Sequence, residues 1–242
     1  MTVARTSIFA FFVLLLAIGA PPPSVAQGES PEQSGRTAFS KEDYEGAVMY
    51  FTLAIEEESE QSTRSKAQRA DLYFMRGNSF FMMQKSKNAV ADFTKAFELM
   101  EKKDDDPLNR AARALVLNLR SQSLLDLDLA GSALKDIDYA IELAPQVSAY
   151  RRQRALNLYA MDKLTEALAD LNVAIGTVSK DSFLYAFRGH IYNELGKTDL
   201  AKRDFETASK MDKAGADLVK QFTQAKAKER KNQDGETKSG KK

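Results

Sequence analysis

Cysteine is absent from this sequence, and histidine occurs once, as His190. Disulfide bonds, thiolate nucleophiles and cysteine-bound metals are therefore excluded by the inventory alone. A zinc site of the usual kinds draws on several Cys or His ligands, and a Ser/His/Asp triad needs its histidine beside an identifiable nucleophile. The sequence shows no paired acids, phosphate-binding loop or nucleophile motif either. We predict that the chain is not an enzyme and has no cofactor and no metal.

A surplus of positive charge is also missing. The formal net charge is +1, and Arg5 is the only charged residue among the first 26, so the remainder holds 34 basic and 34 acidic residues. Nucleic-acid binders need a cationic surplus to displace counterions from phosphate. The sequence therefore predicts no nucleic-acid partner, whereas a hydrophobic content of 43% is sufficient for a packed core.

Long apolar runs are limited to one, near the N-terminus. Arg5 precedes 13 apolar residues from Ile8 to Ala20, which three prolines and a few small residues follow. This order is typical of a secretory signal peptide, here residues 1–26, with cleavage between Ala26 and Gln27. A helix needs about 20 residues to span a bilayer, so we expect no stable membrane span after cleavage. The protein is then exported, to the periplasm or beyond; retention as an uncleaved anchor is the alternative.

One pattern of small and bulky residues recurs five times. Each segment has an alanine, a bulky apolar residue four positions later and another alanine three positions after that, at Ala47/Phe51/Ala54, Ala89/Phe93/Ala96, Ala133/Ile137/Ala140, Ala167/Leu171/Ala174 and Ala201/Phe205/Ala208. These spacings place the three residues on one helical stripe. Twelve residues before each first alanine stands a small residue, at Gly35, Gly77, Ser121, Ala155 and Gly189. We expect small residues to face each other and let two antiparallel helices approach closely.

The first alanines are separated by 42, 44, 34 and 34 residues. A helix-turn-helix period of 34 residues with these landmarks resembles the tetratricopeptide repeat. The fifth unit matches best, through Tyr185, Gly189, Tyr192, Gly196, Ala201, Phe205 and Ala208. The resemblance implies an all-α, right-handed superhelical solenoid of about five repeats over residues 27–213, in units near 28–61, 70–103, 114–147, 148–181 and 182–213.

Beyond the repeats, residues 214–231 carry Leu218, Val219 and Phe222 at helical spacing. We expect a capping helix there, because a repeat stack must cover its last apolar face. Residues 232–242 have almost no apolar side chains and are predicted to form a disordered basic tail. Solvation is the simplest role for this tail, and weak adhesion to an anionic surface is the alternative.

Arginine and aspartate also recur in register. The residue before each small landmark is Arg76, Arg120, Arg154 or Arg188 in units two to five, and the residue before each bulky landmark is Asp92, Asp136, Asp170 or Asp204. Unit one lacks both charges. We infer that each arginine and aspartate of units two to five form a salt bridge within their own unit, because pairing between successive units would leave Arg76 without an aspartate. Independent solvated charges are the alternative.

The resemblance also implies where a partner binds, because proteins of this family usually hold a peptide or a partner's helix in a concave groove lined by the first helix of each repeat. The groove positions transfer here to Phe74, Asn78, Phe81, Asn118, Gln122, Leu125, Arg152, Leu156, Tyr159, Phe183, His190 and Asn193. Amides can bond a peptide backbone, and aromatic rings offer apolar contact area. Core packing is the alternative for some of them, above all Leu125 and Leu156.

These positions lead to one main functional hypothesis and one rival. The main hypothesis is an exported scaffold that binds a protein or peptide partner in the groove, in envelope assembly or as an accessory subunit. Arg152 is the single cation among the twelve groove residues, so we do not transfer the specificity of some family members for a terminal carboxylate. The rival is a self-associating structural subunit, a homo-oligomer formed through Phe74, Phe81 and Phe183.

Overall fold

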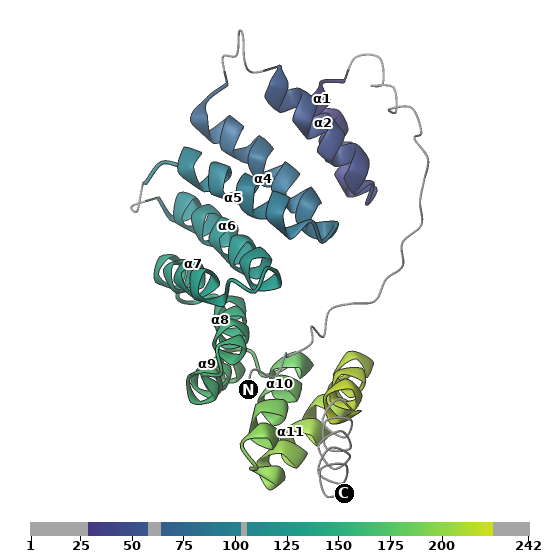
Figure 1. Ribbon diagram of the computed structural model, residues 1–242, viewed down its shortest axis with the longest axis vertical. Helices are drawn as coiled ribbons and strands as arrows, with labels where there is room; N and C mark the ends of the chain where they lie inside the picture. Colours follow the sequence, from purple (N-terminus) through teal and green to yellow (C-terminus); the bar gives the residue numbers. More distant parts are fainter. Residues whose placement is uncertain (1–28, 58–63, 103–105, 225–242) are drawn as a thin grey trace, which may run out of the picture.

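The computed structural model describes residues 29–57, 64–102 and 106–224 (Figure 1). All regular elements within these residues are helices: α1 Pro31–Ser40, α2 Tyr44–Glu56, α4 Lys66–Met82, α5 Ser86–Leu99, α6 Pro107–Asp126, α7 Ala130–Leu143, α8 Ser148–Ala160, α9 Leu164–Thr177, α10 Ser182–Glu194 and α11 Thr198–Met211, followed by a helix over 213–224. The predicted signal peptide and basic tail lie outside the described residues. None of the described helices is long and apolar enough to cross a bilayer.

The helices form a stack of antiparallel hairpins. Within a unit α1 packs on α2, α4 on α5, α6 on α7, α8 on α9 and α10 on α11, and the second helix of each unit packs on the first helix of the next. Figure 1 shows the resulting curved row of helix pairs, running from α1 to the helix after α11. The prediction of an all-α solenoid of helix-turn-helix repeats is confirmed.

The alanine stripe forms the inner contact of each hairpin, but the small landmark has a different partner from the one we expected. Both alanines and the bulky residue between them are almost completely buried in the first four units. A Cβ atom added at Gly77 would lie 3.0 Å from the Phe93 ring, and one added at Gly189 would lie 2.8 Å from the Phe205 ring. The small residue therefore faces the bulky residue of the second helix, not an alanine.

The turn between the two helices of each unit has one residue in the left-handed backbone region. Glu42, Gln84, Asp128 and Asp162 have φ between 57° and 62°, and Gly196 has φ of 72°. These five residues occupy the same position in their units, seven after the small landmark. Glycine adopts this conformation without the steric cost that the side chains of the other four residues carry.

The predicted ion pairs form within each unit. The guanidinium of each arginine donates two hydrogen bonds to both carboxylate oxygens of its aspartate, at 2.6–2.8 Å, in the pairs Arg76–Asp92, Arg120–Asp136, Arg154–Asp170 and Arg188–Asp204. The aspartates are buried. Hydrogen bonds to Asp170 and Asp138 raise the pKa of Arg154, although burial opposes them. The alternative of solvated charges is wrong.

Each of these arginines also reaches the preceding unit, which the sequence analysis did not anticipate. The third nitrogen, Nη1, donates to the residue that follows the preceding bulky landmark: Thr52, Thr94, Asp138 or Asn172, at 2.8–3.2 Å. One side chain thus ties three helices together, the two of its own hairpin and the second helix of the unit before. Register along the stack and within the hairpin is set by the same guanidinium.

The last unit is built as an end. Two positions on each second helix face the next unit, and they are apolar in units one to four: Val48/Ile55, Val90/Phe97, Leu134/Ile141 and Leu168/Ile175. In unit five the same positions hold Lys202 and Ser209, both exposed. The helix over 213–224 covers the rest of this face, with Phe222 in the core. The predicted capping helix is therefore present over its described part.

Asp212 starts this final helix. Its carboxylate accepts the backbone N–H of Gly215 at 2.6 Å and the hydroxyl of Ser182 at 2.9 Å. These two bonds, the backbone bond first, lower the pKa of Asp212 below its ordinary value of 3.8. The carboxylate therefore caps the helix and fastens it to the start of α10.

Because the pKa of Asp212 is lower in the folded state, its contribution is complete above the ordinary value and is lost as the pH falls through the lowered one. We expect the protection factors of the amides in residues 213–224, which correct for the slower intrinsic exchange in acid, to fall below about pH 4, before those of the rest of the stack. The variant Asp212→Asn keeps an N-cap acceptor without titrating, so this acid-specific step should disappear. An identical acid response in that variant would contradict the assignment.

Candidate functional site

The candidate site is the face formed by successive first helices, α4, α6, α8 and α10. Of the ten residues proposed to bind a partner, Phe74, Asn78, Phe81, Gln122, Arg152, Tyr159, Phe183 and Asn193 are partly exposed, whereas Asn118 and His190 are buried. Their positions on neighbouring, packed helices follow from the register of the stack. They fall into two groups, one on α4 and α6 and one on α8 and α10, and Asn193 also lines a cavity at the end of the stack.

The first cluster lies on α4 and α6 and consists of Phe74, Asn78, Phe81, Asn118 and Gln122. The ring of Phe74 lies 6.1 Å from the ring of core residue Phe93, so part of it is committed to packing. Asn118 is 9% exposed, and its Oδ1 accepts no hydrogen bond from any described residue. A buried amide oxygen without a donor costs about 1–3 kcal/mol, which a bound N–H group would offset.

Sequence reasoning missed two leucines that extend this cluster. Helix α6 has 20 residues, against 13 in α8 and α10, because Asp106 caps it early and Pro107 stands at its first position. Leu115 lies seven residues before Gln122, and Leu108 lies seven residues before Leu115. Seven residues are close to two helical turns, so all three side chains lie along one side of α6. Leu108 is 82% exposed and Leu115 is 41% exposed. The signal available in the sequence was the spacing of seven residues from Leu108 to Leu115 and from Leu115 to Gln122.

The second cluster lies between α8 and α10. The Arg152 guanidinium is 5.4 Å from the Phe183 ring, and its Nη1 donates to Asp181 at 3.3 Å. Asp181 also caps α10, by accepting the backbone N–H of Phe183 at 3.0 Å. Both Arg152 and Phe183 were predicted to face a partner. In the structure they stack on each other, and Asp181 compensates the charge of Arg152.

Tyr159 and His190 also meet in this cluster, with Glu194. The Tyr159 hydroxyl is 2.8 Å from both His190 Nε2 and Glu194 Oε1. The hydroxyl has one proton and an ionised carboxylate only accepts, so Tyr159 donates to Glu194 and His190 Nε2 donates to Tyr159. Phe222 of the final helix stacks on His190, with ring centroids 4.4 Å apart. His190 is thus a buried packing residue and not a surface contact.

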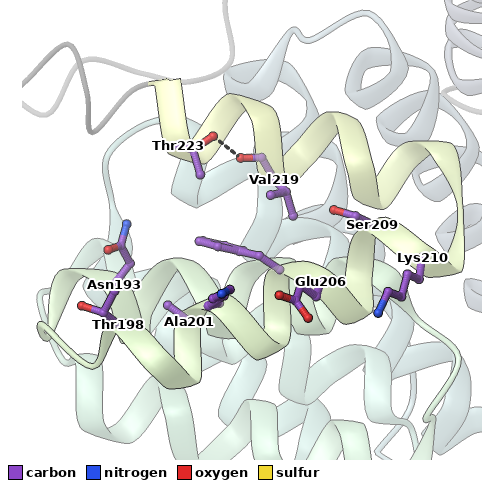
Figure 2. A pocket seen from close by; sticks show the side chains of 10 residues that line it. Asn193, Thr198, Ala201, Glu206, Ser209, Lys210, Val219 and Thr223 are labelled. Atoms are coloured by element: carbon purple, nitrogen blue, oxygen red, sulfur yellow. Dashed lines mark hydrogen bonds between the residues drawn. The ribbon is translucent and has the colours of Figure 1, made fainter.

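Asn193 points to a different place, a cavity at the end of the stack. Its volume is about 590 Å³. Figure 2 shows its lining side chains between α11 and the final helix. Its lining includes Ala201 and Val219 together with Glu206, Ser209 and Lys210. Because Lys202 and Ser209 replace the apolar residues of earlier units here, we assign the cavity to the solvated end of the stack.

The cations on the candidate face are compensated, and Asp126 at the end of α6 accepts a hydrogen bond from the Ser86 hydroxyl. The described first helices carry Arg36 and Arg152 at groove positions, and both are ion-paired: Arg36 with Glu32 and Asp71, Arg152 with Asp181. Capture of a terminal carboxylate needs cations that are available to the ligand. No described group of three or more His, Asp or Glu residues is arranged to hold a metal ion. The site can offer amide hydrogen bonds and apolar contact.

Comparison with known proteins identifies the repeat. Residues 184–214 match the family model "Tetratricopeptide repeat". Solved structures with a similar fold include MamA (16% identity, TM-score 0.60, covering 76% of this chain and 96% of that one) and residues 41 to the end of MamA from Desulfovibrio magneticus RS-1 (12%, 0.63, 78% and 98%). A third is YrrB (20%, 0.58, 77% and 88%). No curated protein matches the sequence. This chain is a tetratricopeptide repeat protein, a helical solenoid of five hairpins within the described residues.

Proposed function

We propose that this protein is a non-enzymatic scaffold that binds a protein or peptide partner on the face of α4 and α6. The observation that carries the proposal is the buried Oδ1 of Asn118, which no described residue satisfies. Gln122 stands one turn further along α6, and Asn78 holds on α4 the position that Gln122 holds on α6; both amides are partly exposed. Buried amide oxygens in folded proteins are nearly always bonded. YrrB, which shares the fold, is described as having an unusual peptide-binding site, and this is consistent with the proposal.

The proposal is tested by removing two amides. In the double variant Asn78→Ala and Gln122→Ala, we expect partner capture to fall at least tenfold while helicity and thermal unfolding stay unchanged. A tenfold loss corresponds to about 1.4 kcal/mol, which two lost hydrogen bonds supply. The matched control replaces Asn88 of α5 and Gln221 of the final helix, both exposed and away from the face. Capture is measured by crosslinking in the native envelope followed by mass spectrometry.

Normal capture by the Asn78/Gln122 variant would refute this face as the site. Self-association through Phe74, Phe81 and Phe183 is the competing function, and light scattering of the purified protein separates the two. Phe74 and Phe183 are already engaged, by Phe93 and by Arg152 and Phe187. We expect a monodisperse monomer, and a concentration-dependent oligomer that Phe81→Ala dissolves would favour the rival.

We further propose that the scaffold acts outside the cytoplasm, in the cell envelope. The charged, apolar and small-residue regions of residues 1–26 support export. We expect the intact mass of the protein recovered from cells to match a chain that begins at Gln27. A chain that retains residues 1–26 in the membrane fraction would instead support the uncleaved anchor.

A further inference from the structure

The face of α4 and α6 is uncharged along its centre. Asp71 on α4 and Asp126 on α6 stand at the two ends of this face. The residues of α4 and α6 that lie on the face between them are apolar or amides: Phe74, Asn78, Phe81, Met82, Leu115, Asn118, Gln122 and Leu125. Both cations on the wider face are compensated by carboxylates of the chain itself. Burying a charged side chain at the centre of this face, between Asp71 and Asp126, would therefore leave that charge without a counterion, at a cost of several kcal/mol. Electrostatics favour a neutral segment.

The amides discriminate between an extended and a helical partner. A helix satisfies its own backbone groups and offers none along its length, whereas an extended segment presents an N–H or C=O at each residue. Asn78, Asn118 and Gln122 supply acceptors and donors suited to such a backbone. The buried Oδ1 of Asn118 needs an N–H donor, which only the extended segment has in series.

The two extra turns of α6 lengthen the apolar part of this face. Leu108 and Leu115 continue the line of Gln122 by about 20 Å, taking 1.5 Å per helical residue. Leu108 at 82% exposure has almost no contact within the protein, and Met82 at 48% exposure lies at the opposite end of the same face. Scattered surface leucines are ordinary, but three apolar side chains that border one set of amides form a directional surface.

We propose that this surface binds an internal, extended, uncharged segment of a partner protein, with apolar side chains at alternate positions. The inference rests on the proposed function and adds the class of partner. Asn78, Asn118 and Gln122 bond the backbone, and Leu108 and Leu115 contact the side chains that point toward α6. A free C-terminal carboxylate contributes nothing to recognition.

The test uses two libraries of random twelve-residue peptides, displayed either within a loop or with a free C-terminus, and selected on the purified protein. We expect the loop library to yield binders with apolar residues at alternate positions, and methylation of alternate backbone nitrogens to abolish their binding. Leu108→Asp and Leu115→Asp should each weaken a selected peptide at least tenfold. Leu53→Asp is the matched control, because Leu53 on α2 is 39% exposed against 41% for Leu115.

Each contrary result has a separate meaning. Binders that require a free C-terminus, that become helical by circular dichroism, or that tolerate both leucine variants would overturn the inference. If peptides of these three kinds no longer bind the Asn78/Gln122 variant, the proposed function still holds. Binders indifferent to every variant on this face would overturn both, and an empty loop selection would overturn the inference alone.

Discussion

Replacing Gly189 with alanine is expected to destabilise the fifth unit by about 1–3 kcal/mol, although alanine is the better helix former. The added Cβ would lie 2.8 Å from Phe205 Cδ1 and 3.1 Å from Asp204 Cβ. Neither neighbour can move freely, because Phe205 packs against the core cluster and Asp204 is held by two hydrogen bonds from Arg188. Hydrogen exchange across α10 and α11 measures the loss.

The matched control is the same substitution at Gly176, a helical glycine of α9. A Cβ there meets no atom within 4 Å. Gly176→Ala should therefore stabilise the protein by about 0.5–1 kcal/mol, through the helix propensity alone. Opposite signs at the two positions are the expected result. A stabilising Gly189→Ala would show that the hairpin contact is looser than the geometry requires.

Removing the carboxylate of Asp170 is expected to have the other large effect, about 2–3 kcal/mol of lost stability. Asp170 accepts two hydrogen bonds from Arg154 and lies 3.6 Å from Arg151 Nη1. Its side chain is 6% exposed, so Asp170→Ala leaves two arginines facing a buried gap. Loss of one partner from a buried pair costs about 3–5 kcal/mol, and the 27% exposure of the Arg154 side chain reduces this figure.

Asp138 provides the control within the same arginine. It accepts from Arg154 Nη1 at 3.0 Å, but its side chain is 45% exposed. Asp138→Ala should cost less than about 1 kcal/mol, as exposed pairs do. A double-mutant cycle with Arg154→Ala then isolates the coupling to Asp170. A coupling energy near zero, measured by chemical denaturation, would show that the pair sets register without adding stability.

The fold was predictable because its determinants repeat. Spacings of three, four and twelve residues place alanine, bulky and small residues on facing helices. A departure from the pattern in one unit does not hide it, because four other units show it. Arg76 and Asp92 were paired from sequence because both charges are absent together from unit one. The prediction that a small residue lies opposite Gly189 was wrong, because Phe205 lies there. Periodicity gives the face of a helix but not which residue lies opposite.

The candidate site was less predictable for a related reason. Groove positions were transferred from the family, and a position on the inner side of α10 does not reveal that Phe222, more than thirty residues later, covers His190. Leu108 and Leu115 were missed because the groove positions were taken from repeats of ordinary length, whereas Asp106 and Pro107 begin α6 early. Contacts between distant segments and variable helix ends are not encoded in a repeat.

The polar residues at the end of unit five, Lys202 and Ser209, constrain how such an array changes length during evolution. A hairpin appended after α11 would lay its first helix on a lysine and a serine, where every earlier junction has two apolar side chains. A copy of unit four inserted between units four and five would pack its first helix on Leu168 and Ile175 of the original unit. The copy's own leucine and isoleucine at these positions would then pack against unit five. Growth by internal duplication is therefore tolerated, and growth at the terminus requires prior substitution of both polar residues.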